Sequence, residues 1–140
     1  MTDAVLHTNV ILRHLLNDST VHSPAASAVL ARIEAGEITA SLSSIAIAEA
    51  VWVLSGQVYR LDRTSIHAAL TQLIQLPNLS VRDRDALLEA LDIYRDFNVA
   101  FADAFHAAIA RQTGGAVYSF DRGLGRIPGI TRLEPAPPRP

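Results

Sequence analysis

The stretch Ala4-Val5-Leu6-His7-Thr8-Asn9-Val10 sets the fold of this chain. Its first three residues form a short apolar run that indicates a buried strand, and Thr8 or Asn9 can cap a helix directly after it. The same alternation of strand and helix continues along the chain. It predicts further strands at Ile38–Ser41, Leu79–Val81, Ala116–Ser119 and Ile130–Leu133. Between them, capping residues and apolar spacing predict helices over residues 24–35, 43–58, 63–76, 83–97 and 101–112.

Short strands that alternate with helices indicate an α/β fold with a parallel sheet covered on both faces. We expect one domain over residues 1–134, followed by a Pro-rich tail over 135–140. Ligands of such folds bind beyond the carboxyl ends of the strands. His7 and Asp121 each follow a predicted strand, so a parallel arrangement would bring them to one edge of the sheet.

The composition excludes several kinds of chemistry. There are no cysteines, which removes disulfides, thiolate zinc sites and cysteine nucleophiles and fits a cytoplasmic protein. All 12 basic residues are Arg. This disfavours a Walker-type phosphate loop and a Schiff-base enzyme, which need a Lys, and a phosphate-receiver domain, which normally uses one. A zinc-protease motif, a serine-hydrolase elbow and a dinucleotide fingerprint are also absent from the sequence.

Charge and hydropathy limit the partners. The net charge is −2, which argues mildly against a protein that grips nucleic acid by bulk electrostatics. Any RNA or DNA would therefore bind at a local site and not through the overall charge of the protein. No uncharged apolar run approaches about 18 residues, so we expect no membrane span, and the N-terminal segment does not have the pattern of an export signal.

Three acidic residues stand at positions that suit a site for a hard divalent cation. Glu49 shares an apolar helical stripe with Ile45, Ala48, Trp52 and Val53, where a carboxylate needs a hydrogen bond, an ion pair or a metal. The alternative for Glu49 is an acid that reaches water or pairs with an arginine such as Arg13. Asp103 falls in the first turn of its helix, where the helix dipole alone favours an acid. Asp121 follows a strand, where an Asp often caps the next turn.

The histidines carry less information. His14, His22 and His67 have the pattern of surface or stripe-edge residues. His106 lies one turn after Asp103, where a partly buried structural histidine is the more ordinary interpretation.

Four segments in order resemble the PIN-domain family, and within it the VapC-type toxins of bacterial toxin–antitoxin pairs. The family opens with a strand that runs into Asp-Thr-Asn-Val, then has an Ala-Glu-x-x-x-x-Leu helix, a Phe-x-Asp-Ala segment and Thr/Ser-Phe-Asp after a strand. The corresponding segments here are Leu6-His7-Thr8-Asn9-Val10, Ala48-Glu49-Ala50-Val51-Trp52-Val53-Leu54, Phe101-Ala102-Asp103-Ala104 and Ser119-Phe120-Asp121. The resemblance covers roughly residues 4 to 133.

The resemblance implies a three-layer α/β/α sandwich and RNA cleavage that depends on Mg²⁺ or Mn²⁺. It assigns Glu49, Asp103 and Asp121 as acidic metal ligands and Asn9 and Ser119 as supporting polar residues. Arg122 and Arg126 follow the last acid, where they would contact phosphate or lie on a solvated surface. The family's further acid near the third motif is missing, because Ala100-Phe101-Ala102 stands there. The implied partners are a cognate antitoxin, an RNA substrate and a second copy of the chain.

His7 departs from the family pattern, which has an aspartate metal ligand at this position. An imidazole binds metal through nitrogen and adds no negative charge, whereas Mg²⁺ prefers oxygen ligands and Mn²⁺ or Zn²⁺ accepts nitrogen more readily. We therefore expect weakened Mg²⁺ binding and reduced cleavage. Asp and His codons differ by one base, which is compatible with an inactivating escape, a deliberate knock-out or a naturally degenerate toxin. The alternative functions are a non-catalytic PIN-like domain that binds RNA or a protein, and a structure-specific DNA nuclease.

Overall fold

A computed structural model describes residues 3–139 of the chain. The chain divides into two compact units, Met1–Arg84 and Asp85–Pro140. Each unit has its own parallel sheet, so the α/β class and the parallel strand direction are confirmed. The expectation of a single domain over 1–134 stays a prediction.

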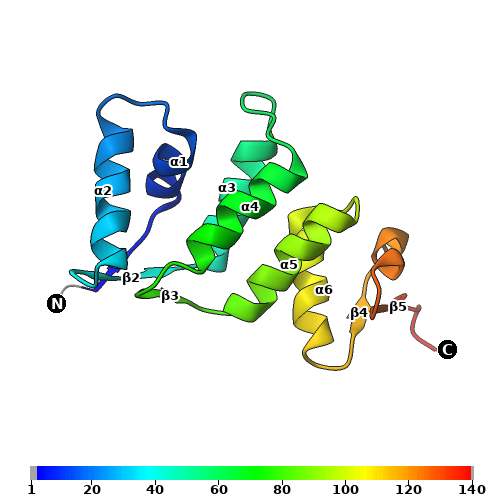
Figure 1. Ribbon diagram of the computed structural model, residues 1–140. Helices are drawn as coiled ribbons and strands as arrows, with labels where there is room; N and C mark the ends of the chain where they lie inside the picture. The colour runs from blue at the N-terminus through cyan, green and yellow to red at the C-terminus, as the bar shows by residue number, and fades with distance from the viewer. Residues whose placement is uncertain (1–2, 140) are drawn as a thin grey trace. The chain divides into compact units, whose positions relative to one another are not determined.

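The first unit holds a three-stranded parallel sheet in the order β1-β2-β3 and most of the helices (Figure 1). The register pairs Ala4 with Ala40, and Ala40 with Leu79. Helix α1 packs against both α2 and α3, and α3 packs against α4. The elements are β1 (Asp3–Val5), α1 (Thr8–Leu16), α2 (His22–Glu34), β2 (Thr39–Leu42), α3 (Ser44–Ser55), α4 (Arg63–Ile74) and β3 (Leu79–Val81).

The second unit holds a two-stranded parallel sheet, β4-β5. Its aromatic core includes Phe101, whose ring meets that of Tyr94 edge to face with centroids 6.2 Å apart. The elements are α5 (Arg84–Asp96), α6 (Phe101–Arg111), β4 (Ala116–Tyr118), the 3-10 helix η1 (Arg122–Arg126) and β5 (Thr131–Leu133). Within residues 3–139, every helix is too short or too polar to cross a lipid bilayer.

The predicted elements are found, with corrections at the first strand and at three helix ends. The first strand is not buried, because all three residues of β1 are exposed and Val5 is exposed at 75%. His7, rather than Thr8 or Asn9, is the N-cap of α1. Helix α2 begins at His22, one residue before the predicted Ser23 cap, and α3 ends at Ser55 instead of near residue 58. The α3 difference arises because Gly56 ends the helix: its backbone N–H bonds the Val53 carbonyl in a tightened last turn.

The predicted apolar stripe of α3 is wrong about which face is buried. Ile45 and Trp52 are 70% and 78% exposed. The sequence is apolar almost all round this helix, so its periodicity does not select one face. The small side chains of Ala46 and Ala50 let the opposite face approach its neighbours closely. The buried face consists of Ala46, Ile47, Ala50, Val51 and Leu54.

Helix α4 begins at a charged cap whose contribution to stability depends on pH. The Asp62 side chain accepts a hydrogen bond from the Ser65 backbone N–H at 2.7 Å. The bonds from Ser65 hold the pKa of the Asp62 carboxyl below its ordinary value. A lowered carboxyl pKa means that the stabilisation is present above the unfolded-state pKa and is lost as pH falls through the folded-state pKa.

We therefore expect Asp62→Asn to lower the urea midpoint at neutral pH and to lose this effect in acid. The comparison is wild type against Asp62→Asn in urea unfolding from pH 7 downward. Asn can cap a helix without titrating, so the variant removes the charge and keeps the cap. A difference between the two proteins that stays constant with pH would contradict the prediction.

Candidate active site

His7 stands between the first strand and the first helix of the first unit. The Leu6 backbone N–H bonds the Ser41 carbonyl at 2.9 Å, which continues the β1–β2 pairing up to this residue. The His7 backbone is then extended, at φ −79° and ψ 150°, and its Nδ1 accepts a hydrogen bond from the Asn9 backbone N–H at 3.1 Å. The exposed imidazole therefore acts as the N-cap of α1.

Glu49 is held by a residue whose role the sequence did not indicate. Thr8 is 6% exposed, and its Oγ1 donates a hydrogen bond to Glu49 Oε1 at 3.1 Å. This bond ties the first turn of α1 to the middle of α3, while the Glu49 side chain reaches an exposed position. The sequence identified Thr8 only as a possible cap. The one signal for its contact with Glu49 is that Thr8 follows position 7, where the family has an aspartate.

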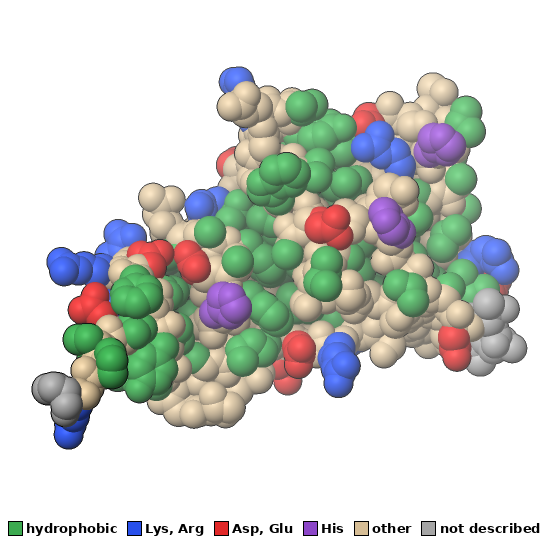
Figure 2. Space-filling model, turned by 180° about the vertical axis from the view of Figure 1, so that it is seen from behind, with side chains coloured by type: hydrophobic (Ala, Val, Ile, Leu, Met, Phe, Trp, Pro, Cys, Tyr) green, Lys and Arg blue, Asp and Glu red, His purple; other side chains and the backbone are tan. Residues whose placement is uncertain are grey.

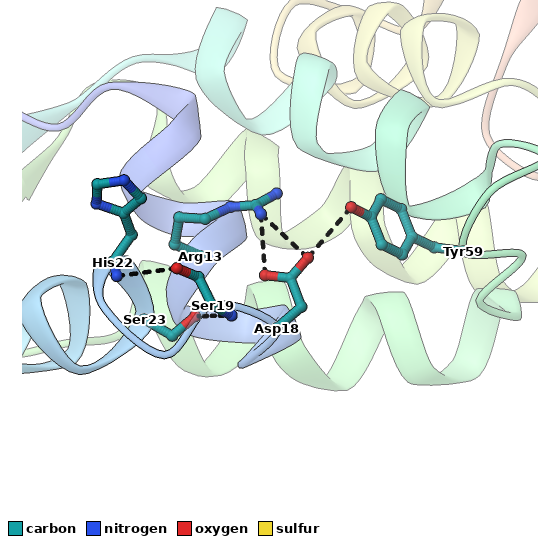
Figure 3. A network of polar contacts seen from close by, with 6 residues as sticks. All are labelled: Arg13, Asp18, Ser19, His22, Ser23 and Tyr59. Atoms are coloured by element: carbon teal, nitrogen blue, oxygen red, sulfur yellow. Dashed lines mark hydrogen bonds and ion pairs between the residues drawn. The ribbon is translucent and has the colours of Figure 1, made fainter.

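The alternative of an ion pair between Glu49 and Arg13 is not what the structure has. Arg13 instead binds Asp18 at 2.9 Å, and the Tyr59 hydroxyl donates to the same carboxylate at 3.3 Å (Figure 3). The hydrogen bond with Tyr59 and the charge of Asp18 raise the pKa of the Arg13 guanidinium. This network joins the end of α1 to the loop before α4. Glu49 is bonded by Thr8 and not by Arg13.

The second unit supplies the other two acids. Asp103 is half-buried in the first turn of α6, as predicted, and that helix has no side-chain cap. An acid here is favoured by the helix dipole. Asp121 is the N-cap of η1, because its Oδ1 accepts a hydrogen bond from the Gly123 backbone N–H at 2.9 Å. The capping alternative for Asp121 is therefore confirmed.

Ser119 organises the segment that follows β4. Its Oγ accepts the Asp121 backbone N–H at 2.9 Å, and its carbonyl accepts a hydrogen bond from Arg132 at 2.8 Å. The hydroxyl is thus used locally. Arg122 and Arg126 are exposed on η1. These contacts fix the backbone of Asp121 while its side chain stays exposed.

The structure brings some of the predicted site residues together. His7, Asn9 and, through Thr8, Glu49 are linked in the first unit; Ser119 and Asp121 are linked in the second. Within either unit, the described residues include no group of three or more His, Asp or Glu side chains that could hold a metal ion. The meeting of His7, Glu49, Asp103 and Asp121 in one pocket stays a prediction.

A sequence model of the PIN domain matches residues 4–130. The chain belongs to the PIN-domain family. No curated protein matches the chain. The PIN domain is a nuclease-type fold of helices and a parallel sheet, consistent with the predicted three-layer α/β/α sandwich. PIN domains generally use divalent metal ions.

The predicted ligand set of this chain differs at position 7 from the set that the sequence resemblance implies. Mg²⁺ demands a near-ideal octahedron of oxygen ligands. Glu49, Asp103 and Asp121 offer carboxylate oxygens, but position 7 offers only an imidazole, and its Nδ1 lone pair already accepts the Asn9 N–H. The set therefore has one fewer anionic oxygen ligand than the family pattern.

Proposed function

We propose that this chain is a VapC-type endoribonuclease toxin of a type II toxin–antitoxin pair, with cleavage impaired by His7. The observation that carries the proposal is the PIN-domain match over residues 4–130. The four motifs in family order support the narrower assignment to toxins. The exposed Glu49 carboxylate, tied to α1 through Thr8, is an acid placed to meet a substrate rather than to fill a core.

In this proposal Glu49, Asp103 and Asp121 are the acidic ligands for Mg²⁺ or Mn²⁺, and a bound ion would activate water for attack on a phosphodiester. Asn9 and Ser119 support the site. Arg122 and Arg126 are exposed and available to contact phosphate. We assign no cleavage step to the form that carries His7, because position 7 offers the ion no anionic oxygen.

The substrate class is tested with the His7→Asp form, in which position 7 again offers a carboxylate. Single-stranded RNA and DNA of the same base sequence are incubated with this protein and Mg²⁺ or Mn²⁺, and the products are separated on a denaturing gel. We expect cleavage of the RNA and little or none of the DNA. Equal or faster cleavage of DNA would replace the ribonuclease by a DNA nuclease on the same scaffold.

One observation favours a second candidate, a non-catalytic PIN-like domain that binds RNA or a protein partner. The His7 nitrogen that faces the backbone is used as a cap, so position 7 contributes structure where the family has a ligand. Glu49→Gln and Asp121→Asn distinguish the two functions. If both variants leave every measured function intact, the domain acts by binding; if they abolish function, the carboxylates have a chemical role.

We also propose that the chain is a cytoplasmic protein that forms a homodimer and binds an antitoxin. Hydrophobic side chains reach the surface of the face drawn in Figure 2. On and just after α3, Ile45, Trp52 and Val58 are 70%, 78% and 84% exposed. An exposed Trp among aliphatic side chains is the kind of group that dominates protein interfaces.

For the homodimer we expect Trp52→Ser to raise the dissociation constant about 30-fold, the effect of losing one interface hot spot of about 2 kcal/mol. Sedimentation velocity over a concentration series measures it. Val21→Ser is the control, because Val21 is also exposed, at 70%, but lies before α2. A chain that is monomeric at all concentrations, or an equal effect of both variants, would contradict dimerisation through this surface.

A further inference from the structure

One ring nitrogen of His7, Nδ1, has a defined hydrogen bond in the folded chain. Nδ1 accepts the Asn9 backbone N–H at 3.1 Å, so it carries a lone pair rather than a proton. A neutral imidazole has a single N–H, and the proton therefore resides on Nε2. At Nε2 the ring therefore offers an N–H donor and no lone pair.

This arrangement opposes coordination of a metal ion by either nitrogen. Binding through Nε2 would move the proton to Nδ1, where it would face the Asn9 N–H, donor against donor. Binding through Nδ1 would take the lone pair that the Asn9 N–H now uses. In both cases α1 loses its N-cap, so a cation would have to replace the stabilisation that the cap contributes.

We propose that His7 is a positioning residue that caps α1 through Nδ1 and is not a ligand for a divalent ion of any kind. Residue 8 is the first residue of the capped helix, and its hydroxyl holds Glu49. The cap therefore fixes the helix turn that holds the Glu49 carboxylate. This inference rests on the proposed function in one respect, namely that position 7 is where the family has an acidic metal ligand. It replaces the expectation that Mn²⁺ or Zn²⁺ would accept this imidazole.

Three substitutions separate the cap from the ligand. Asn at position 7 caps a helix but offers no anionic oxygen, Ala does neither, and Asp does both. We expect His7→Ala to raise the unfolding equilibrium constant about fivefold, the usual effect of losing an N-cap, and His7→Asn to leave it unchanged within about twofold. Urea unfolding in the presence of a chelator measures these values without RNA or cleavage.

The same four proteins are then unfolded with Mg²⁺, Mn²⁺ or Zn²⁺. Wild type and His7→Asn should respond identically to each ion. The inference is overturned if Mn²⁺ or Zn²⁺ stabilises wild type and His7→Asn abolishes that stabilisation, or if His7→Ala is as stable as His7→Asn. A metal response that appears only in His7→Asp supports the proposed function separately; its absence counts against the metal-dependent nuclease and leaves the role of His7 intact.

A measurement on the unaltered chain covers the case in which a variant fails to fold. Long-range ¹H–¹⁵N spectra at about pH 8, where an ordinary histidine is neutral, distinguish a protonated ring nitrogen from one with a lone pair. We expect the proton on Nε2 of His7 and no change in either ring nitrogen when Zn²⁺ is added. A proton on Nδ1, or a ring shift on adding Zn²⁺, would overturn the inference.

Discussion

Replacing His7 with Asp is expected to raise metal-dependent RNA cleavage at least about a hundredfold. The size of this increase follows from the rate that enzymes usually lose when one group that stabilises the charge of the transition state is removed. Asp can take over the cap on α1, so the helix and the Thr8–Glu49 contact are kept while an anionic oxygen is added. The measurement is the initial rate of cleavage of a labelled RNA in Mg²⁺ or Mn²⁺, with a chelator as the blank.

His7→Asn is the matched control, because it caps the helix and adds no charge. Its rate should equal that of wild type. In the His7→Asp background, Glu49→Gln should remove the gained activity, since the amide has lost the negative charge that a cation requires. If His7→Asp gives no gain in RNA cleavage and no growth arrest in cells, the proposed toxin activity is wrong.

The proposed binding of an antitoxin should be less sensitive to residue 7 than cleavage is. Three carboxylates remain at the family's acidic positions, and a basic side chain of a partner would still meet negative charge there. We expect this partner, if it copurifies with wild type, to copurify with His7→Asp to a similar extent. The two readouts therefore separate loss of catalysis from loss of the toxin–antitoxin interaction.

Much of the fold follows from local patterns in the sequence. Leu79–Val81 is predicted to the residue, because Leu79 and Val81 alternate with Ser80 between Pro77-Asn78 and a charged segment, a pattern typical of a short strand. The buried face of α3 cannot be derived from the sequence, because the exposed residues Ile45 and Trp52 are as apolar as the residues that are buried. Only packing against neighbouring helices decides which side of such a helix is covered.

The candidate site is harder to derive than the fold. Its acids stand in recognisable motifs, but a motif does not reveal which hydrogen bonds its side chains make. Thr8 as the partner of Glu49 joins residues 41 positions apart, and nothing in the sequence relates them. The cap formed by His7 depends on ring orientation and on the Asn9 N–H, neither of which residue type determines.

The second large effect is expected at Gly115, where α6 gives way to β4. Its φ is +83°, and a Cβ added there would lie 2.4 Å from the carbonyl oxygen of Gly129. Its backbone N–H donates to Ala110 and its carbonyl accepts the Thr131 N–H, each at 2.7 Å. The residue therefore closes the turn that follows α6 and starts the pairing of β4 with β5, and it has no room for a side chain.

Gly115→Ala should lower the free energy of unfolding by about 3 kcal/mol or more, because a positive φ and a backbone clash act together. Gly114→Ala is the matched control: its φ is +108°, but nothing lies within 4 Å of its added Cβ. Strain alone should cost about 1–2 kcal/mol there. Urea unfolding of both variants gives the difference, which isolates the clash with Gly129. Equal losses of unfolding free energy in the two variants would mean that the loop at Gly129 moves aside freely. The β4–β5 pairing that holds Ser119 and Asp121 would then not depend on the close approach of Gly115 to Gly129.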